Sequence, residues 1–116
     1  MGDQAQIVVK ADESDRGVYL YTHWRGDEIV DVLRAALLRG ATRWEDPEYL
    51  ARIIFCQMIL DPSGTVDPIN DTTGFGIGAK QHVTLDHPLI TVNCETQTIS
   101  IGEDNPVSFE DFVKDH

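Results

Sequence analysis

The segment EDPEYLARIIFCQMIL, at residues 45–60, constrains the fold of this chain more than any other stretch. Asp46 is a favourable N-cap and Pro47 fits the first helical position, so a helix is predicted to begin here. After its first turn, Arg52 and Gln57 are the only strongly polar residues. A helix that is apolar on nearly every side must lie in the centre of the molecule or against a partner subunit. We expect the central position, and the second alternative leaves a homodimer open.

Apolar periodicity and composition predict further elements before this helix. The segment GDEIVDVLRAALLRG, at 26–40, reads as another helix that begins at the cap Asp27 and stops at Gly40. Residues 6–10 and 17–24 are rich in β-branched and aromatic side chains, which is typical of strands. Two strands are therefore followed by two consecutive helices.

The segments LITVN and QTISI predict a hairpin whose turn is Glu95–Thr96. Placing Ile90 opposite Ile101, and Val92 opposite Ile99, puts all four apolar side chains on one face. A slip by one residue would move this apolar set to the solvent side, so burial fixes the register. The C-terminal segment VSFEDFVKDH then reads as a short helix that begins with a capping box.

The predicted order of elements is β-β-α-α-β-β-β-α. A chain of 116 residues is long enough for one core, so we expect residues 1–116 to form a single domain. Its predicted class is α+β, with a mostly antiparallel sheet on which the two consecutive helices pack.

The stretch TTGFGIGAK, at residues 72–80, contains a loose dinucleotide-binding fingerprint. A phosphate loop needs a strand before it and a helix after it. Here a proline-containing loop comes first, and KQHVTLDHP, which has no helical pattern, follows. We therefore expect a strand in which Gly74, Gly76 and Gly78 line one face. Such a face admits either the apolar helix at 46–60 or a ligand close to the backbone, and helix packing is the preferred interpretation.

The second predicted strand and the helix start after it form another candidate site. Tyr19, Tyr21 and His23 alternate along one face of the strand, and Trp24 and Arg25 follow at the junction. Free backbone N–H groups at a helix start, beside an imidazole and an indole, can bind a small anion or a partner. In the alternative interpretation, the imidazole and the indole close one end of the core.

The segment after the glycines contains three titratable side chains at close spacing. In an extended segment His82 and Asp86 share one face, and His87 points away. Zinc needs three or four convergent ligands and this segment supplies at most two, so we expect neither a metal nor a cofactor. A small hydrolase built around His23, His82 and Cys94 is the weakest functional alternative, because no motif flanks the thiol. We expect no catalytic residue.

The chain has 20 acidic against nine basic residues, and its formal net charge is −11. Such a surface repels nucleic acid, and it suits solubility, adaptation to salt or docking on a basic protein. Asp61, Asp67 and Asp71 contribute to this acidity in a proline-containing loop, without the ligand spacing of a calcium loop. No apolar run approaches the ~20 residues of a membrane span, and we expect a cytoplasmic protein that does not bind membranes.

Three uncommon patterns occur in the order VYLYTHW-G, RW-DPEYLARIIF--M and TGFGI. Together they resemble a family of small uncharacterised proteins of phages and of bacterial or archaeal mobile elements. The resemblance spans residues 17–101, so the N-terminal strand and the C-terminal helix are expected to be additions. Acidic mobile-element proteins of this size are similar in kind to inhibitors of host defence, including anti-CRISPR proteins, and no catalytic residue carries over.

We therefore expect a non-enzymatic protein that blocks a host defence complex, such as a CRISPR–Cas complex, through its acidic surface. The expected partner is a host protein complex with a basic surface, and the expected compartment is the host cytoplasm. The second alternative is a protein that binds a nucleotide-like signal with Tyr19, Tyr21, His23 and the glycines of the stretch at 72–80.

Overall fold

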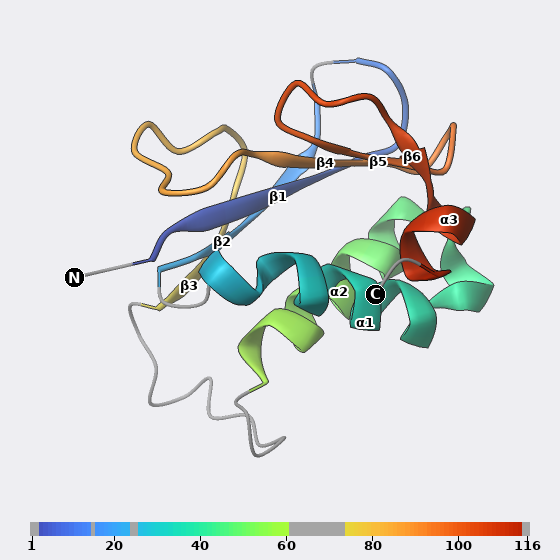
Figure 1. The fold of residues 1–116 in the computed structure, drawn as a ribbon, viewed down its shortest axis with the longest axis horizontal. Coiled ribbons are helices and arrows are strands. Elements are labelled where there is room, and N and C mark those ends of the chain that lie inside the picture. Colours follow the sequence, from blue (N-terminus) through green and yellow to red (C-terminus); the bar gives the residue numbers. More distant parts are fainter. Residues whose placement is uncertain (1–2, 15, 24–25, 61–73, 115–116) are drawn as a thin grey trace.

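The structure, a computed structural model, describes residues 3–14, 16–23, 26–60 and 74–114. Within them, six strands form one sheet and the helices lie against one side of it (Figure 1). The strands are β1 (Ala5–Lys10), β2 (Val18–Thr22), β3 (Phe75–Gly78), β4 (Ile90–Asn93), β5 (Thr98–Ile101) and β6 (Val107–Ser108). The helices are α1 (Ile29–Arg39), α2 (Pro47–Ile59) and α3 (Phe109–Lys114), and short 3-10 turns lie at Gly26–Glu28 (η1) and Ala41–Arg43 (η2).

This arrangement confirms the predicted α+β class. The pairings β1–β2, β2–β3, β4–β5 and β5–β6 are antiparallel, whereas β1 and β4 pair in parallel. The consecutive helices α1 and α2 pack on the sheet as expected, and one short strand, β6, is added to the predicted order before α3. No helix in the described residues is both long and apolar enough to cross a membrane.

The strand β1 lies at the centre of the sheet. The strand order is β3-β2-β1-β4-β5-β6, which places β1 between β2 and β4 (Figure 1). Every residue of Ala5–Val9 is buried. Ile7 pairs with Leu20 of β2 on one side and with Ile90 of β4 on the other. A strand that is buried on both faces is expected to be a continuous apolar run, and Gln6 is the polar exception here.

The central place of β1 does not fit the expectation that the N-terminal strand is an addition to a fold formed by residues 17–101. Without β1, the β2–β3 pair and the β4–β5 pair would have no strand between them. An isolated two-stranded hairpin is marginally stable in water, because it buries too little apolar surface. The sheet therefore depends on β1, at Ala5–Lys10.

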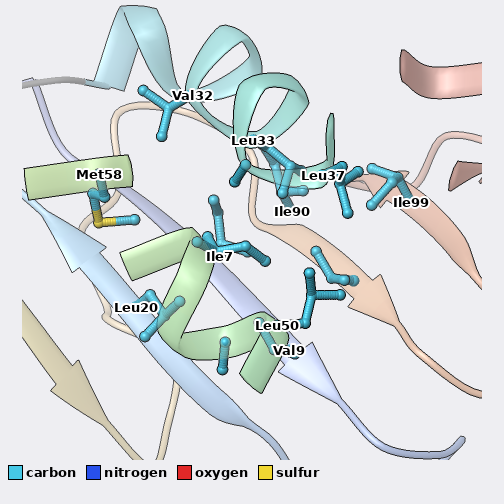
Figure 2. Packing of buried hydrophobic residues seen from close by; sticks show 14 of the residues in the cluster. Ile7, Val9, Leu20, Val32, Leu33, Leu37, Leu50, Met58, Ile90 and Ile99 are labelled. Carbon is cyan, nitrogen blue, oxygen red and sulfur yellow. The ribbon is translucent and has the colours of Figure 1, made fainter. Parts of the chain in front are cut away.

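The hydrophobic core lies between the sheet and the helices (Figure 2). Its labelled side chains come from α1 (Val32, Leu33, Leu37), from α2 (Leu50, Met58) and from the strands (Ile7, Val9, Leu20, Ile90, Ile99). Each of them is at most 4% exposed. Alternate residues of each strand thus face the helices, as the two-residue period of a strand requires. Removal of this apolar set from water is the main driving force for the fold.

Helix α2 begins as predicted, with Asp46 as its N-cap and Pro47 as its first residue. The buried residues of α2 are Leu50, Ala51, Ile54 and Met58. They recur every three or four positions and form one face, whereas Tyr49 is 47% exposed. The helix therefore contributes to the core with one side, and the expected central position holds for that side alone.

Gly40 ends α1 as predicted, but not through the left-handed conformation that favours glycine at helix ends. Its φ is −96°, which any residue can adopt. A Cβ at this position would lie 3.2 Å from the carbonyl oxygen of Ala36 and 3.2 Å from Cδ1 of Ile53 in α2. The absence of a side chain at Gly40 therefore lets α2 pass close to the end of α1.

The predicted N-cap of α1 is wrong. The helix begins after η1, with Glu28 at the cap position and without a side-chain cap hydrogen bond. Asp27 instead donates its backbone N–H to Oδ2 of Asp3 at 2.8 Å. The N–H of Gly26 donates to the carbonyl oxygen of the same Asp3 at 2.8 Å. A residue that is distant in the sequence thus holds the start of the helix, and a local capping pattern cannot reveal it.

The β4–β5 hairpin confirms the predicted register. Ile90 pairs with Ile101, and Val92 pairs with Ile99. Both residues of the predicted turn donate their backbone N–H groups to Oδ1 of Asn93, at 2.9 and 3.1 Å. This local bonding closes the turn, and the shared face of three buried aliphatic side chains and the half-buried Ile101 fixes the pairing.

The substitution Ile54→Ala is expected to lower the free energy of unfolding by about 2–4 kcal/mol, because truncation of a fully buried side chain leaves a cavity. The matched control is Ile77→Ala, which removes the same atoms from a side chain that is 65% exposed. That control should change the free energy of unfolding by less than about 1 kcal/mol. Urea unfolding followed by circular dichroism measures both, and equal losses would contradict the packing of α2.

Candidate binding site on strands β2 and β3

The pairing of β2 with β3 brings together residues that lie more than fifty positions apart in the sequence. Tyr19 is opposite Gly78, and Tyr21 is opposite Gly76. The backbone N–H of His23 donates to the carbonyl oxygen of Gly74 at 2.9 Å. The tyrosine strand and the glycine stretch, which the sequence presents as two candidate sites, therefore form one surface. We call the side of β3 that holds Gly76 and Gly78 the glycine face.

The glycine face points away from the helices. Leu20 and Thr22 of β2 are buried on the helix side, so Tyr19 and Tyr21 occupy the opposite side together with their glycine partners. A Cβ at Gly76 would meet Tyr21 at 4.0 Å, and one at Gly78 would meet no described atom within 4 Å. The preferred interpretation, in which the glycines let helix α2 pack closely, is therefore wrong. Among the described residues, the glycine face is left open to a ligand or a partner.

The ring of Tyr21 lies at the centre of this surface. It stacks on His82, with 4.5 Å between the ring centroids and 15° between the ring planes. Its hydroxyl forms a hydrogen bond with Nδ1 of His23 at 3.0 Å. Burial, and then the negative charge of Asp86, raise the pKa of the Tyr21 phenol above its usual value. The phenol therefore stays neutral at physiological pH and serves as a flat aromatic surface.

Gln6, which was not predicted as a site residue, positions His82 over Tyr21. This central-strand side chain is 3% exposed. Its amide donates to the carbonyl oxygen of Lys80 at 3.3 Å and accepts the backbone N–H of His82 at 2.8 Å. The segment after β3 is thereby attached to the side of the sheet that faces away from the helices (Figure 1). Its place within an otherwise apolar strand was the sign in the sequence that could have identified Gln6, because a buried amide must find hydrogen-bond partners.

A second set of bonds holds the end of the same segment. Nε2 of His87 lies 2.5 Å from Oδ1 of Asp3. The hydrogen bond with His87 lowers the pKa of the Asp3 carboxyl, against the opposing effect of its desolvation. The backbone N–H of Asp86 donates to the carbonyl oxygen of Gln4 at 3.0 Å. The backbone N–H of Gln4 donates in turn to Oδ2 of Asp86 at 2.7 Å. His87 is therefore used to fix the segment and does not face Tyr21.

The geometry does not assemble the hydrolase alternative. Cys94 is 5% exposed, and its N–H donates to the carbonyl oxygen of Lys10. The backbone N–H of His82 donates instead to Gln6. Gln6 lies four residues from Lys10 along β1, which corresponds to about 13 Å between the two positions. Burial, and then the charge of Asp46, raise the pKa of the Cys94 thiol to about 11. A buried thiol that stays protonated is the opposite of an activated nucleophile.

Several predicted site residues lie outside the described part of the chain. These are Trp24, Arg25, Asp61, Asp67 and Asp71. Within the described ranges, no three His, Cys, Asp or Glu side chains converge as a metal site would require. The side chains that do converge are those of Tyr21, His23 and His82, with the amide of Gln6 on the backbone of His82.

Comparisons with protein-family models, with curated proteins and with solved structures find no match to this chain. The function must therefore be inferred from the residues and their arrangement.

The substitution Gly76→Ala is expected to leave the free energy of unfolding unchanged or to raise it by up to about 1 kcal/mol, because a methyl group fits and glycine is unfavourable within strands. The control is Gly17→Ala, whose Cβ would lie 2.5 Å from Cγ2 of the buried Val8. That change should lower the free energy of unfolding by about 1–3 kcal/mol. Thermal unfolding compares the two, and a large loss at Gly76 would restore the packing interpretation.

Cys56, the other cysteine of the chain, is replaced by serine so that the reaction reports on Cys94 alone. In this Cys56→Ser variant, the thiol of Cys94 is expected to resist alkylation by iodoacetamide at pH 8. A pKa of about 11 leaves roughly a hundredth of the thiolate that an ordinary cysteine has, and burial slows access further. Mass spectrometry measures the rate at which Cys94 is alkylated in the native protein and in the urea-unfolded protein. Equal rates in the two states would show that Cys94 is accessible and reactive, contrary to the described geometry.

Proposed function

We propose that this chain is a non-enzymatic binding protein that docks on the basic surface of a partner protein. The observation that supports this proposal is the exposure of its carboxylates. Among the acidic residues of the described chain, every side chain except those of Asp3 and Asp46 is exposed. The exposed carboxylates occur on the helix layer, as at Glu45 and Glu48, and at strand ends, as at Glu95.

Ion pairs within the chain leave its formal net charge at −11. In the described residues, Asp31 pairs with Arg34 and Glu110 pairs with Lys114. Both carboxylates are largely exposed, and such surface pairs contribute little to stability. The net negative charge can therefore attract a basic partner, steer its approach and select it against acidic competitors.

An acidic protein of this kind can compete with nucleic acid for a positively charged channel, because both offer closely spaced negative charges. The resemblance to mobile-element proteins favours a host defence complex, such as a CRISPR–Cas complex, as the owner of that channel. The proposed result is inhibition by protein–protein binding, with no chemical step.

Binding of a nucleotide-like ligand is the second candidate function, and the open glycine face favours it. Tyr21 and His82 form a stack beside backbone that carries no side chains at Gly76 and Gly78. A planar base could stack on such a surface. The change Gly78→Val should then abolish ligand-induced shifts of the Tyr21 and His82 ring resonances during titration with mononucleotides. No shift with any of them would exclude this candidate.

The leading proposal predicts that capture of basic host proteins weakens steeply with salt, because exposed charges are screened within about 8 Å at physiological ionic strength. Immobilised protein is exposed to host lysate at low and high salt, and the captured proteins are identified by mass spectrometry. The double change Glu45→Gln and Glu95→Gln should weaken capture.

The matched control for this experiment changes the charge in the opposite direction. Arg39 is exposed, and Arg39→Gln makes the chain more acidic. This variant should capture the same proteins equally well or better. Capture that is indifferent to salt, or that is weakened as much by Arg39→Gln as by the loss of two carboxylates, would contradict the acidic-surface mechanism.

A further inference from the structure

A small cavity lies at the opposite end of the sheet from the glycine face. It is formed where β5 turns into β6 and where α3 packs beneath them. Its lining residues are Ile99, Ile101, Asp104, Asn105, Val107 and Phe112, and its volume is about 80 Å³. The cavity is partly open to solvent.

The volume of the cavity restricts what it can hold. A pocket for a drug-sized molecule or a nucleotide typically measures about 300–1,000 Å³. A single water needs about 10–15 Å³ by the same kind of measure. A cavity of about 80 Å³ therefore fits the end of one side chain and is too small for a whole nucleotide.

The walls of the cavity combine an apolar floor with a polar rim that carries one carboxylate. Ile99 is 2% exposed and Phe112 is 6% exposed, so both belong to the floor. Val107, which is 42% exposed, stands at the opening, and Asp104 and Asn105 supply its polar groups. The ion pairs of the described residues do not include Asp104. This arrangement suits a ligand with an apolar stem and a cationic head.

The ring of Phe112 already contacts one guanidinium, that of Arg34, which does not line the cavity. The guanidinium carbon of Arg34 lies 4.9 Å from the ring centroid of Phe112. Nε of Arg34 also donates to the carbonyl oxygen of Phe112 at 3.0 Å. A planar guanidinium is weakly hydrated, stacks on aromatic rings and forms paired hydrogen bonds with a carboxylate, whereas an ammonium does so less well.

We propose that this cavity receives an arginine side chain of a basic partner protein. The stem of the arginine passes Val107 at the opening, and its guanidinium lies over Phe112 and binds the carboxylate of Asp104. This inference rests on the proposed function, since it assigns a place on the acidic protein at which the basic partner is anchored. Arginine is enriched among the residues that dominate protein–protein affinity, and such residues lie in well-packed, desolvated pockets.

The test uses a short oligoarginine peptide as the probe and an oligolysine peptide of equal length for comparison. The isotope-labelled protein is titrated with each peptide and followed by NMR. Oligoarginine should shift the methyl resonances of Ile99, Ile101 and Val107. Asp104→Asn should weaken oligoarginine binding by about threefold to tenfold, in the range of one partly desolvated charge pair.

The neighbouring Glu103 provides the matched control. It is exposed, carries the same charge and does not line the cavity. Glu103→Gln should weaken binding by less than about twofold, because it removes only long-range attraction. Oligolysine should bind more weakly and should be affected equally by the two substitutions.

Salt-dependent oligoarginine binding without methyl shifts in the cavity, or with equal losses for Asp104→Asn and Glu103→Gln, would overturn the arginine site. The proposed function would survive either result, because the peptide would still bind the acidic surface. Failure of both peptides to bind at low salt would overturn the arginine site and the proposed function together.

Discussion

The parallel pairing of β1 with β4 is the interaction on which the rest of the structure depends. It joins the N-terminal β1–β2–β3 part of the sheet to the β4–β5–β6 part. Ile7 and Val9 meet Ile90 and Val92 in this pairing and place them under the same helix layer. Because the pairing connects residues about eighty positions apart, its formation requires closure of a long loop, which the burial of β1 on both faces offsets.

The two faces of the sheet are consequently covered by different kinds of residues. The helix side is filled by aliphatic residues, and its packing fixes the fold. On the other side, Gln6 attaches the segment that carries His82, and the glycine face lies beside the resulting aromatic stack. The exposed carboxylates are spread over the helix layer and the ends of the strands, whereas the cavity at Asp104 lies at one position, beside β5 and β6. In the proposed function, general attraction and local anchoring are thus assigned to different parts of the molecule.

The sequence predicted those features that depend on neighbouring residues and missed those that depend on distant ones. The β4–β5 register followed from alternation, because a slip would expose its apolar residues. Alternation also showed that Gly76 and Gly78 share a face, but only the sheet order shows that this face is turned away from α2. The bonds from Asp3 to η1 and from Gln6 to His82 join segments without a local pattern. The Asp104 cavity likewise needs α3, which no motif places beneath β5.

Hydrogen exchange of individual backbone amides tests the central place of β1 most directly. In a central strand every amide is paired, so Ile7, Val8 and Val9 should exchange as slowly as the most protected amides of the protein, through global unfolding. The amide of Ile77, in a strand at the edge of the described sheet, should exchange much faster. Exchange of the three β1 amides as fast as that of Ile77, under conditions in which the core of α1 stays protected, would contradict the account.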